Sequence, residues 1–440
     1  MDINTAFKLF DIRGKFPQVV DERLAYALAK ALTKWRDPHK VLVCCDTRES
    51  SPSLKEFLAD GFASGSVAVY DLGEAPLPMF NFAMTQGPYD LGIMVTASHV
   101  SEDENGFKMV LPGPLPLDEK QVQEVKQIIN AFKDESIVVP KIPVQKVTVG
   151  DSYTTEILNR VGSSKPKLKI AVDATKSAVL TTIMVLFQKL AADVHFVSSK
   201  VSGNPLIATN RKALEKDVVA SKSDLGVIWD SDGDRVVFVD RRGQLIPISF
   251  VLGILAAAAI AAGRTKKVAV DIRAGLVVRD LVADAGGQLQ ILPAWNTYIK
   301  FAMHDDPEIV FGGETSGHFI FPDFFAIDDG ILAALRFIRL FDQGVVEEKL
   351  QDLSKKYFEL PEQNIPCPTE KAATILEKLT EHYRKSDCLI SVVDGLTVFG
   401  PNFKFNLRES VTEPFLRLNL ETPDEKTAKE IKEKVVQLIS

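Results

Sequence analysis

The chain has 440 residues, of which 46% are hydrophobic and 25% charged, and its formal net charge is −7. This composition is typical of a soluble globular protein with several domains, and it excludes a mostly disordered chain. The negative charge disfavours binding to nucleic acid or to an anionic membrane, although a local basic pocket for a small anion is still compatible with it.

The start of the chain lacks the basic and apolar regions of a secretory signal. The longest apolar run, Phe250 to Ala262, is shorter than the roughly 20 residues needed to cross a bilayer and predicts a buried helix. We therefore expect a cytoplasmic protein that does not bind membranes. The cysteines lack metal-binding spacing and are expected to be reduced thiols. They are Cys44, Cys45, Cys367 and Cys388.

Strand-like apolar runs alternate with helical patterns over most of the chain, which indicates an α/β fold. Three of these runs share one pattern, in which a basic residue, an apolar strand and a closing aspartate follow each other. The closing residues are Asp46, Asp173 and Asp271. The recurrence predicts three similar α/β domains in tandem with parallel or mixed sheets.

The last part of the chain has a different pattern. A helical pattern near 370–383 precedes short runs, and the run Leu416 to Leu420 alternates apolar and polar residues. This is typical of antiparallel strands and predicts a C-terminal α+β domain. Proline-containing stretches without periodicity mark the boundaries between domains. The predicted domains are 1–145, 146–246, 247–360 and 361–440.

The first candidate for chemistry is the segment Thr96 to His99, which directly follows the apolar run Leu91 to Val95. A serine at the C-terminal end of a strand in an α/β unit lies where ligands usually bind. Ser98 could therefore be a nucleophile or a phosphoryl carrier, with Lys108 offering a cation or a proton-accepting amine nearby. An ordinary strand-ending loop is the alternative for this segment alone.

The next candidate is the acidic loop Asp230 to Arg235, set between two apolar runs. Its three aspartates, Asp230, Asp232 and Asp234, repel each other unless a hard cation lies among them, and carboxylate oxygens suit magnesium or calcium. An EF-hand does not fit, because Arg235 stands where that loop needs glycine. The loop predicts a divalent metal site, with an acidic solvated turn as the alternative.

Two later loops carry polar groups suited to a sugar phosphate. The segment Gly312 to His318 offers a carboxylate, two hydroxyls and an imidazole, which can discriminate between sugar hydroxyls. Arg408, Ser410 and Thr412 alternate, so an extended backbone would place them on one face as a fork for a phosphate dianion. A glycine-rich turn and a surface turn are the respective alternatives.

These four loops, in this order, resemble the α-D-phosphohexomutase superfamily, particularly its phosphomannomutase/phosphoglucomutase branch. The resemblance covers essentially the whole chain, and further matching segments are 10–14, 46–52, 71–73 and 325–330. It implies four domains around a central cleft and an enzyme that interconverts hexose 1-phosphate and hexose 6-phosphate, of mannose or glucose, through a phosphoserine and a bisphosphorylated sugar. It also implies Mg²⁺ as cofactor, hexose 1,6-bisphosphate as activator, a small sugar phosphate as partner, and a monomer or dimer.

The resemblance further implies a role for individual residues. The implied metal ligands are Asp230, Asp232, Asp234 and the phosphorylated Ser98. The implied catalytic residues are Ser98, Lys108, His99, Arg13, Arg235 and His318. The implied substrate-binding residues are Glu314, Thr315, Ser316, Arg273, Asn296, Arg408, Ser410 and Thr412. Lys108 is the first candidate for the general base if nearby cations lower its pKa, and His318 is the second.

The sequence departs from the family pattern at three places. Val100-Ser101 follows His99 where Asn-Pro is usual, and Trp295 to Thr297 replaces a Gly-His-Ser segment. Ser231 replaces a glycine, which we expect to be tolerated only if its φ is not positive. Because of these changes, and because Thr315 does not decide between sugars, phosphoglucosamine mutase and a sugar-phosphate-binding protein with little or no activity are alternatives.

Overall fold

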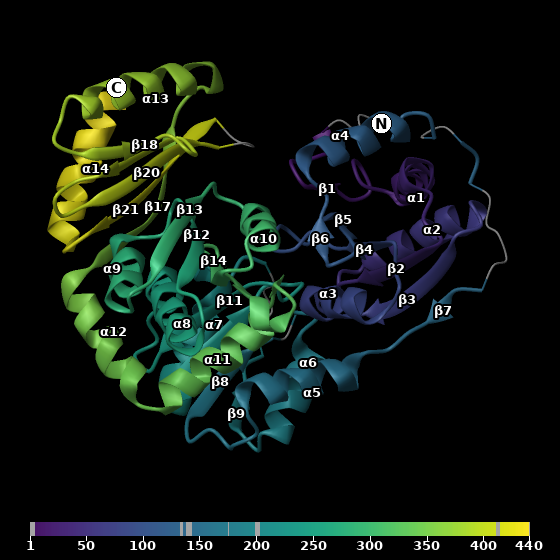
Figure 1. Ribbon diagram of the computed structural model, residues 1–440, viewed down its shortest axis with the longest axis horizontal. Coiled ribbons are helices and arrows are strands. Elements are labelled where there is room, and N and C mark those ends of the chain that lie inside the picture. The colour runs from purple at the N-terminus through teal and green to yellow at the C-terminus, as the bar shows by residue number, and fades with distance from the viewer. Residues whose placement is uncertain are drawn as a thin grey trace. The chain divides into compact units, whose positions relative to one another are not determined.

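The computed structural model describes residues 5–132, 135–137, 143–174, 176–198, 203–410 and 414–439. Its contacts divide the chain into two compact units. The first comprises 1–245 and 323–336, and the second comprises 246–322 and 337–440 (Figure 1).

A seven-stranded sheet begins the first unit, with strand order β1-β5-β4-β2-β3-β7 and β6 beside β5. Its strands are β1 (Asp11–Lys15), β2 (Lys40–Cys45), β3 (Ala68–Glu74), β4 (Leu91–Val95), β5 (Glu104–Leu111), β6 (Leu115–Pro116) and β7 (Gln145–Lys146). Strands β2, β3 and β4 are parallel, whereas β5 runs antiparallel to both β4 and β1. The sheet is therefore mixed, as predicted.

Helices cover both faces of this sheet. They are α1 (Glu22–Arg36), α2 (Ser51–Ser64), α3 (Leu77–Gln86) and α4 (Glu119–Ile129). Leu91 and Ile93 of β4 face the core shared with α1, α2 and α4. Gly92 points the other way, because strand residues alternate, and a side chain there would meet Phe80 and Met84 of α3. Burial on both faces explains why β4 is continuously apolar.

A four-stranded sheet with order β11-β10-β8-β9 completes the first unit. Its strands are β8 (Lys169–Asp173), β9 (Asp193–Phe196), β10 (Leu225–Trp229) and β11 (Val236–Asp240). The accompanying helices are α5 (Gly150–Val161), α6 (Leu180–Lys189) and α7 (Ala208–Ser221). The segment 323–336 adds β16 (Ile327–Asp328) and the start of α11 (Gly330–Asp342), where the indole of Trp229 donates to the Gly330 carbonyl at 2.9 Å.

The second unit contains a further α/β sheet with strands in the order β13-β12-β14-β15. These are β12 (Lys267–Asp271), β13 (Gln288–Leu292), β14 (Ile309–Glu314) and β15 (His318–Phe321). The helices are α8 (Ile248–Ala262), α9 (Leu276–Asp284), α10 (Asn296–Asp305) and α12 (Val345–Lys356). The run that predicted a buried helix forms α8, most of whose side chains are buried.

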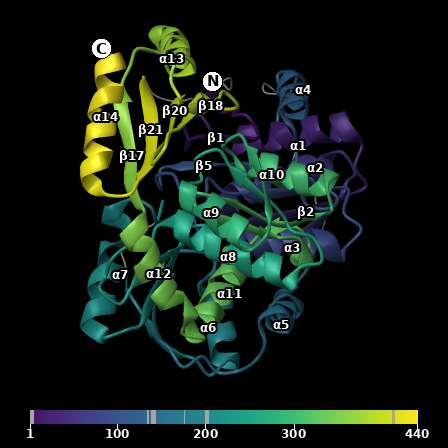
Figure 2. The ribbon, with the colours of Figure 1, turned by 60° about the vertical axis from the view of Figure 1, so that its left-hand side comes forward.

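The chain ends in an antiparallel sheet with order β17-β21-β20-β19-β18. Its strands are β17 (Phe358–Pro366), β18 (Leu389–Ser391), β19 (Leu396–Phe399), β20 (Lys404–Glu409) and β21 (Phe415–Thr422). Helices α13 (Thr369–Arg384) and α14 (Glu425–Ile439) cover one face of it (Figure 2). The period of two in β21 places Leu416, Leu418 and Leu420 under these helices.

The predicted fold class, three mixed α/β sheets followed by a C-terminal α+β sheet, is confirmed. The domain boundaries remain predictions, and β7, which includes position 145, pairs with β3 of the first sheet. None of the four cysteines forms a disulfide. No helix among the described residues has both the length and the apolar character required to cross a bilayer.

Candidate active site

Each of the three α/β sheets carries a candidate loop at the same topological position. The serine loop (96–103) joins β4 to β5, the metal loop (230–235) joins β10 to β11, and the sugar loop (315–317) joins β14 to β15. In each case the first strand is parallel to an inner neighbour and the second is antiparallel to the first. The loops therefore leave the C-terminal ends of parallel strands, where α/β sheets bind ligands.

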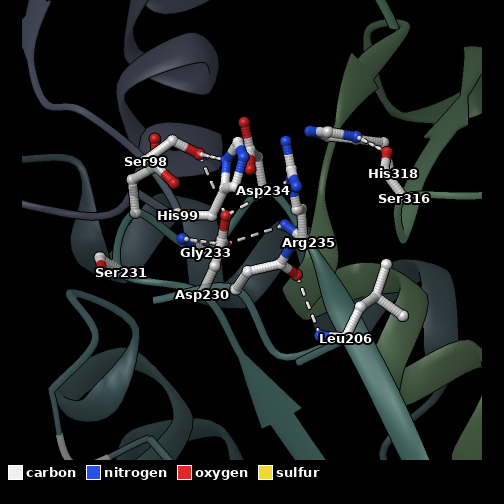
Figure 3. Close-up of polar contacts among 12 residues, drawn as sticks. Ser98, His99, Leu206, Asp230, Ser231, Gly233, Asp234, Arg235, Ser316 and His318 are labelled. Atoms are coloured by element: carbon white, nitrogen blue, oxygen red, sulfur yellow. Dashed lines mark hydrogen bonds and ion pairs between the residues drawn. The ribbon is translucent and has the colours of Figure 1, made fainter. Parts of the chain in front are cut away.

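The serine loop and the metal loop are in contact within the first unit. The hydroxyl of Ser98 donates to Asp230 Oδ2 at 3.1 Å, and His99 Nδ1 lies 3.4 Å from the same hydroxyl (Figure 3). Thr96 Oγ1 accepts from the Ser98 amide at 2.8 Å and donates to Asp232 Oδ2 at 3.2 Å. Two segments that the sequence singled out separately thus form one site.

Ser98 has an unusual backbone conformation. Its φ is 55°, in the left-handed region, and the residue is only 1% exposed. A non-glycine residue there is disfavoured by roughly 1 kcal/mol or more, so the surrounding structure must hold it. This conformation directs the Ser98 side chain towards Asp230.

The aspartates of the metal loop fit a divalent cation. Asp230, Asp232 and Asp234 are all buried, and one carboxylate oxygen from each lies within 4.8 Å of the others. Burial and the charges of Asp234 and Asp232 raise the pKa of Asp230 well above its ordinary value. Among the described residues, Asp232 Oδ1 is buried without a hydrogen-bond partner. Hard oxygen donors gathered out of solvent are the ligands that magnesium takes.

The backbone of the metal loop resolves the question raised by Ser231. Gly233 has a φ of 78°, whereas Ser231 is not among the described residues with positive φ. The condition under which serine is tolerated at position 231 is therefore met. Asp230 Oδ1 closes the loop by accepting from the amides of Gly233 at 3.1 Å and Arg235 at 3.2 Å. Arg235 Nε lies 3.7 Å from Asp230 Oδ2.

Two further predicted cations, Lys108 and Arg13, lie on neighbouring strands β5 and β1. Lys108 Nζ donates to Asp232 Oδ2 at 2.9 Å and Asp234 Oδ2 at 2.7 Å. Burial lowers the pKa of Lys108, but the two aspartates raise it more, so its pKa lies above the ordinary value. The expected lowering by nearby cations is not found, and these surroundings favour an ammonium over a base. Arg13 Nε donates to Asp11 at 2.9 Å.

In the second unit, the sugar loop and its flanking strands form a polar network. Glu314 Oε2 accepts from Ser316 Oγ at 2.7 Å and lies 2.9 Å from His318 Nδ1. Ser316 Oγ and His318 Nδ1 are 2.8 Å apart (Figure 3). Arg273 forms an ion pair with Glu314. Burial raises the pKa of Glu314, but Arg273 and His318 lower it by more than burial raises it. The pKa therefore lies below its ordinary value, and the carboxylate stays ionised.

Asp271, at the end of β12, accepts hydrogen bonds from two residues next to this network, Arg273 and Thr315. It accepts from the amide of Arg273 at 2.6 Å and from its Nε at 3.0 Å. It also accepts from the Thr315 amide at 2.6 Å and from the Thr315 hydroxyl at 3.1 Å. The Thr315 hydroxyl, predicted to bind substrate, is thus engaged by Asp271, so its substrate role remains a prediction.

The predicted phosphate fork lies at the end of β20. Arg408 Nε and Ser410 Oγ are buried and have no hydrogen-bond partner among the described residues, while Arg408 Nη2 lies 3.8 Å from Glu362. Buried donors without an acceptor suit an anionic ligand. Thr412, the third predicted member, lies outside the described residues.

Asn296 stands at the start of α10, next to a second strained residue. Trp295 has a φ of 146°. The segment that replaces Gly-His-Ser therefore keeps a backbone conformation that glycine adopts more readily. Asn296 remains a predicted substrate ligand.

Sequence reasoning gave no role in the site to three residues that shape it: Arg48, Thr96 and Asp271. A weak signal for two of them was present, because Asp-x-Arg occurs at Asp46 to Arg48 and at Asp271 to Arg273, as it also does from Asp11, Asp21 and Asp240. At Asp11, Asp46, Asp240 and Asp271 the aspartate binds the arginine two residues later.

Three regions match models of phosphoglucomutase/phosphomannomutase domains. They are α/β/α domain I at residues 4–136, α/β/α domain III at 249–361 and the C-terminal domain at 362–438. A phosphomannomutase of Methanocaldococcus jannaschii is 32% identical and covers 99% of this chain and 97% of its own. The chain belongs to the phosphoglucomutase/phosphomannomutase family.

Other members of the family agree with this assignment. The phosphomannomutase of Escherichia coli is 27% identical over 95% of each chain. A crystal structure of a phosphoglucomutase/phosphomannomutase family protein from Burkholderia thailandensis has a TM-score of 0.87 and 25% identity, and covers 99% of this chain and 97% of its own. The predicted membership of the α-D-phosphohexomutase superfamily is confirmed, and the protein is a phosphohexomutase, an enzyme of the phosphotransferase (mutase) type.

Proposed function

We propose that this phosphohexomutase interconverts the 1-phosphate and 6-phosphate of mannose or glucose, and that Ser98 carries the phosphoryl group. The observation that supports this most directly is the position of the Ser98 hydroxyl. It is held 3.1 Å from Asp230 by a left-handed backbone, beside the other two aspartates of the metal loop.

Asp230, Asp232 and Asp234 would hold Mg²⁺, together with an oxygen of phosphorylated Ser98. Bound magnesium supplies positive charge next to the transferred phosphoryl oxygens, which is the main requirement of phosphoryl transfer. Lys108, Arg13 and Arg235 add cationic groups of the protein around the same carboxylates. His99, next to the hydroxyl, would orient it.

The reaction then proceeds in two balanced transfers. In the first, the bond between Ser98 Oγ and phosphorus breaks as the free hydroxyl of the sugar phosphate bonds to phosphorus and gives its proton to a base, and Ser98 Oγ takes up a proton as it leaves. In the second, Ser98 Oγ gives up its proton and bonds to the phosphorus at the other end of the bisphosphate, while the bond from that phosphorus to the sugar oxygen breaks and the sugar oxygen takes up a proton. To act as the base, Lys108 would first have to give up a proton that two carboxylates stabilise. His318 is the other candidate for the base. Hexose 1,6-bisphosphate would act as activator by phosphorylating Ser98.

The second unit would supply the groups that hold the substrate. Glu314 and Ser316, preoriented by their mutual hydrogen bond, are proposed to bind sugar hydroxyls. Arg408 and Ser410, with Thr412, are proposed to grip the phosphate that is not transferred. Arg273, Asn296 and Thr315 complete the proposed substrate set.

A mutase assay with magnesium and a hexose bisphosphate primer tests the proposal. We expect turnover of mannose or glucose 1-phosphate, loss of nearly all turnover in Ser98→Ala, and retained binding of substrate by that variant. Ser152→Ala, at an exposed serine of α5, is the control and should behave as wild type. Turnover of glucosamine 1-phosphate alone would make the enzyme a phosphoglucosamine mutase. Binding without turnover by wild type would make it a sugar-phosphate-binding protein.

A further inference from the structure

We propose that Arg48, held by Asp46, is a positioning residue for the phosphoryl-accepting hydroxyl of Ser98. Arg48 is distant in sequence from the serine loop and touches no atom of the proposed transfer. It acts on the backbone of the loop. The inference rests on the proposed function of Ser98.

The guanidinium of Arg48 makes most of its hydrogen bonds to the serine loop. An arginine has five N–H donors in a fixed plane, and here each one has an acceptor. Nε donates to Asp46 Oδ2 at 3.2 Å. Nη1 donates to the carbonyls of Ser101 at 2.7 Å and Glu104 at 3.1 Å, and Nη2 donates to those of Ser98 at 2.6 Å and Val100 at 3.0 Å. The loop is therefore folded around one buried cation.

Asp46 fixes that cation at the edge of the sheet. The residue is fully buried, follows β2, and donates its amide to the carbonyl of Val95 at the end of the parallel strand β4. Its Oδ1 accepts from the Arg48 amide at 3.1 Å and from the Ser51 hydroxyl at 2.5 Å. Strands β2 and β4 end side by side, so the guanidinium of Arg48, just after β2, lies next to the serine loop that follows β4.

We call the hydrogen bonds from Arg48 to the four carbonyls the Arg48 clamp. The clamp accounts for the strained conformation of Ser98. The carbonyl of Ser98 is held by Arg48, and its amide is held by Thr96 Oγ1. With the peptide groups on both sides fixed, the residue stays at positive φ and its hydroxyl stays on Asp230. The loop has Val100 and Ser101 where a proline would otherwise restrict the backbone, so an arginine side chain supplies the rigidity.

Lysine cannot replace this arginine. An ammonium has three donors on one atom, whereas the four carbonyls lie around two separate nitrogens of a planar fork. Arg48→Lys keeps the charge that balances Asp46 and removes the geometry. Asp46→Asn keeps the shape and weakens the hold on the guanidinium.

The test measures steady-state kinetics and the rate at which a hexose bisphosphate phosphorylates Ser98. For Arg48→Lys we expect kcat and the phosphorylation rate to fall on the order of 100-fold, the effect of misplacing a reacting group by about 1 Å. KM for the hexose phosphate should change less than about threefold, since other loops bind the sugar. Asp46→Asn should show the same split between kcat and KM with a smaller fall.

The matched control is Lys55→Met, which removes a 2.8 Å ion pair between Lys55 of α2 and Asp71 of β3. This pair does not involve the serine loop. If Arg48→Lys and Lys55→Met lower kcat equally at equal loss of thermal stability, Arg48 is merely structural and the inference is overturned. Wild-type phosphorylation rates in a folded Arg48→Lys or Asp46→Asn variant would overturn it too. In Arg48→Ala, methylguanidinium but not methylammonium should restore part of the phosphorylation rate. If wild type itself neither turns over nor accepts phosphate at Ser98, the proposed function fails first, and this inference with it.

Discussion

The serine loop and the sugar loop are built on one sequence signature but are held in different ways. Both follow a strand whose parallel neighbour ends in Asp-x-Arg, Asp46 to Arg48 in one sheet and Asp271 to Arg273 in the other. Arg48 binds three backbone carbonyls of its loop and the carbonyl of Glu104, the first residue of β5. Arg273 binds the side chain of Glu314.

The two kinds of contact restrict different substitutions in the two loops. A clamp on carbonyls fixes the shape of a loop and is indifferent to its side chains, which is how Val100 and Ser101 fit the serine loop. A clamp on a carboxylate fixes the identity of a side chain. Glu314 is therefore expected to tolerate no substitution, because His318 and Ser316 depend on it as well.

Among substitutions that leave Ser98 in place, the largest expected effect comes from the acceptor of its hydroxyl. Asp230→Asn removes a negative charge from the proposed metal site, and we expect kcat to fall by about 10²- to 10³-fold, as when one preorganised electrostatic group is lost. A titration of activity against magnesium should shift to higher concentration in the variant. Chelation should abolish wild-type activity and added magnesium should restore it. An unchanged kcat in Asp230→Asn would show that phosphoryl transfer at Ser98 does not depend on this aspartate of the metal loop.

A buried carboxyl outside both loops provides a test of stability in the first unit. Asp329 accepts from the amides of Ile331 and Leu332 and from the hydroxyl of Tyr153 at 2.7 Å, and burial raises its pKa to about 6. The folded state holds this proton more tightly than the unfolded state, so stability falls as pH rises from about 4 to about 6 and then levels off. The contribution is at most about 3 kcal/mol.

Asp329→Asn keeps the shape of the group and cannot ionise. The free energy of unfolding of the variant minus that of wild type should therefore rise between pH 4 and 6, measured by urea denaturation, and stay constant above pH 7. A difference that does not depend on pH would contradict the raised pKa. The Asp329→Asn substitution should not change the rate of Ser98 phosphorylation at constant pH. This distinguishes the stability of the first unit from the positioning of the serine.

The contrast between the two clamps is sharpest in paired lysine variants. Arg273→Lys loosens Glu314, and we expect KM for the hexose phosphate to rise about tenfold, equivalent to about 1.4 kcal/mol of binding. The rate of Ser98 phosphorylation per bound bisphosphate should remain close to that of wild type. Arg48→Lys should give the opposite pattern. The comparison fails if both variants change the same constant.

The smallest effect is expected at Thr315. Thr315→Val removes the hydroxyl that donates to Asp271 and should lower the free energy of unfolding by about 1 kcal/mol, the usual net value of one hydrogen bond. Thr315→Ser should be nearly neutral. If the Thr315 hydroxyl contacts the sugar, as its place in the proposed substrate set requires, the ratio of activity on mannose and glucose phosphates should change in Thr315→Val and not in Thr315→Ser. An unchanged ratio in Thr315→Val would remove the hydroxyl from that set.

The local chemistry of the site was readable from the sequence because it follows strand ends. Apolar runs that close in aspartate predicted β2, β8 and β12, and the adjacent loops held Ser98 and the three aspartates. Alternation predicted the C-terminal sheet, since antiparallel strands with one covered face keep a period of two. These are regularities of residue type, which a single sequence carries.

The contacts made by backbone groups were not readable in the same way. Arg48 binds carbonyls, which every residue possesses, so no residue type marks its partners. The pairing of Lys108 with Asp232 and Asp234 joins segments more than a hundred residues apart, and it reversed the expected direction of the Lys108 pKa. The inward turn of the Thr315 hydroxyl depends on Asp271 in a neighbouring strand.

The central claim is that the Ser98 hydroxyl receives the phosphoryl group, and locating the phosphate tests it most directly. Wild-type protein incubated with magnesium and a hexose 1,6-bisphosphate should gain the mass of one phosphate, and peptide fragmentation should place it on Ser98. A hexose phosphate added afterwards should remove it. Phosphate on a different residue, or none on a protein that still turns over substrate, would contradict the account.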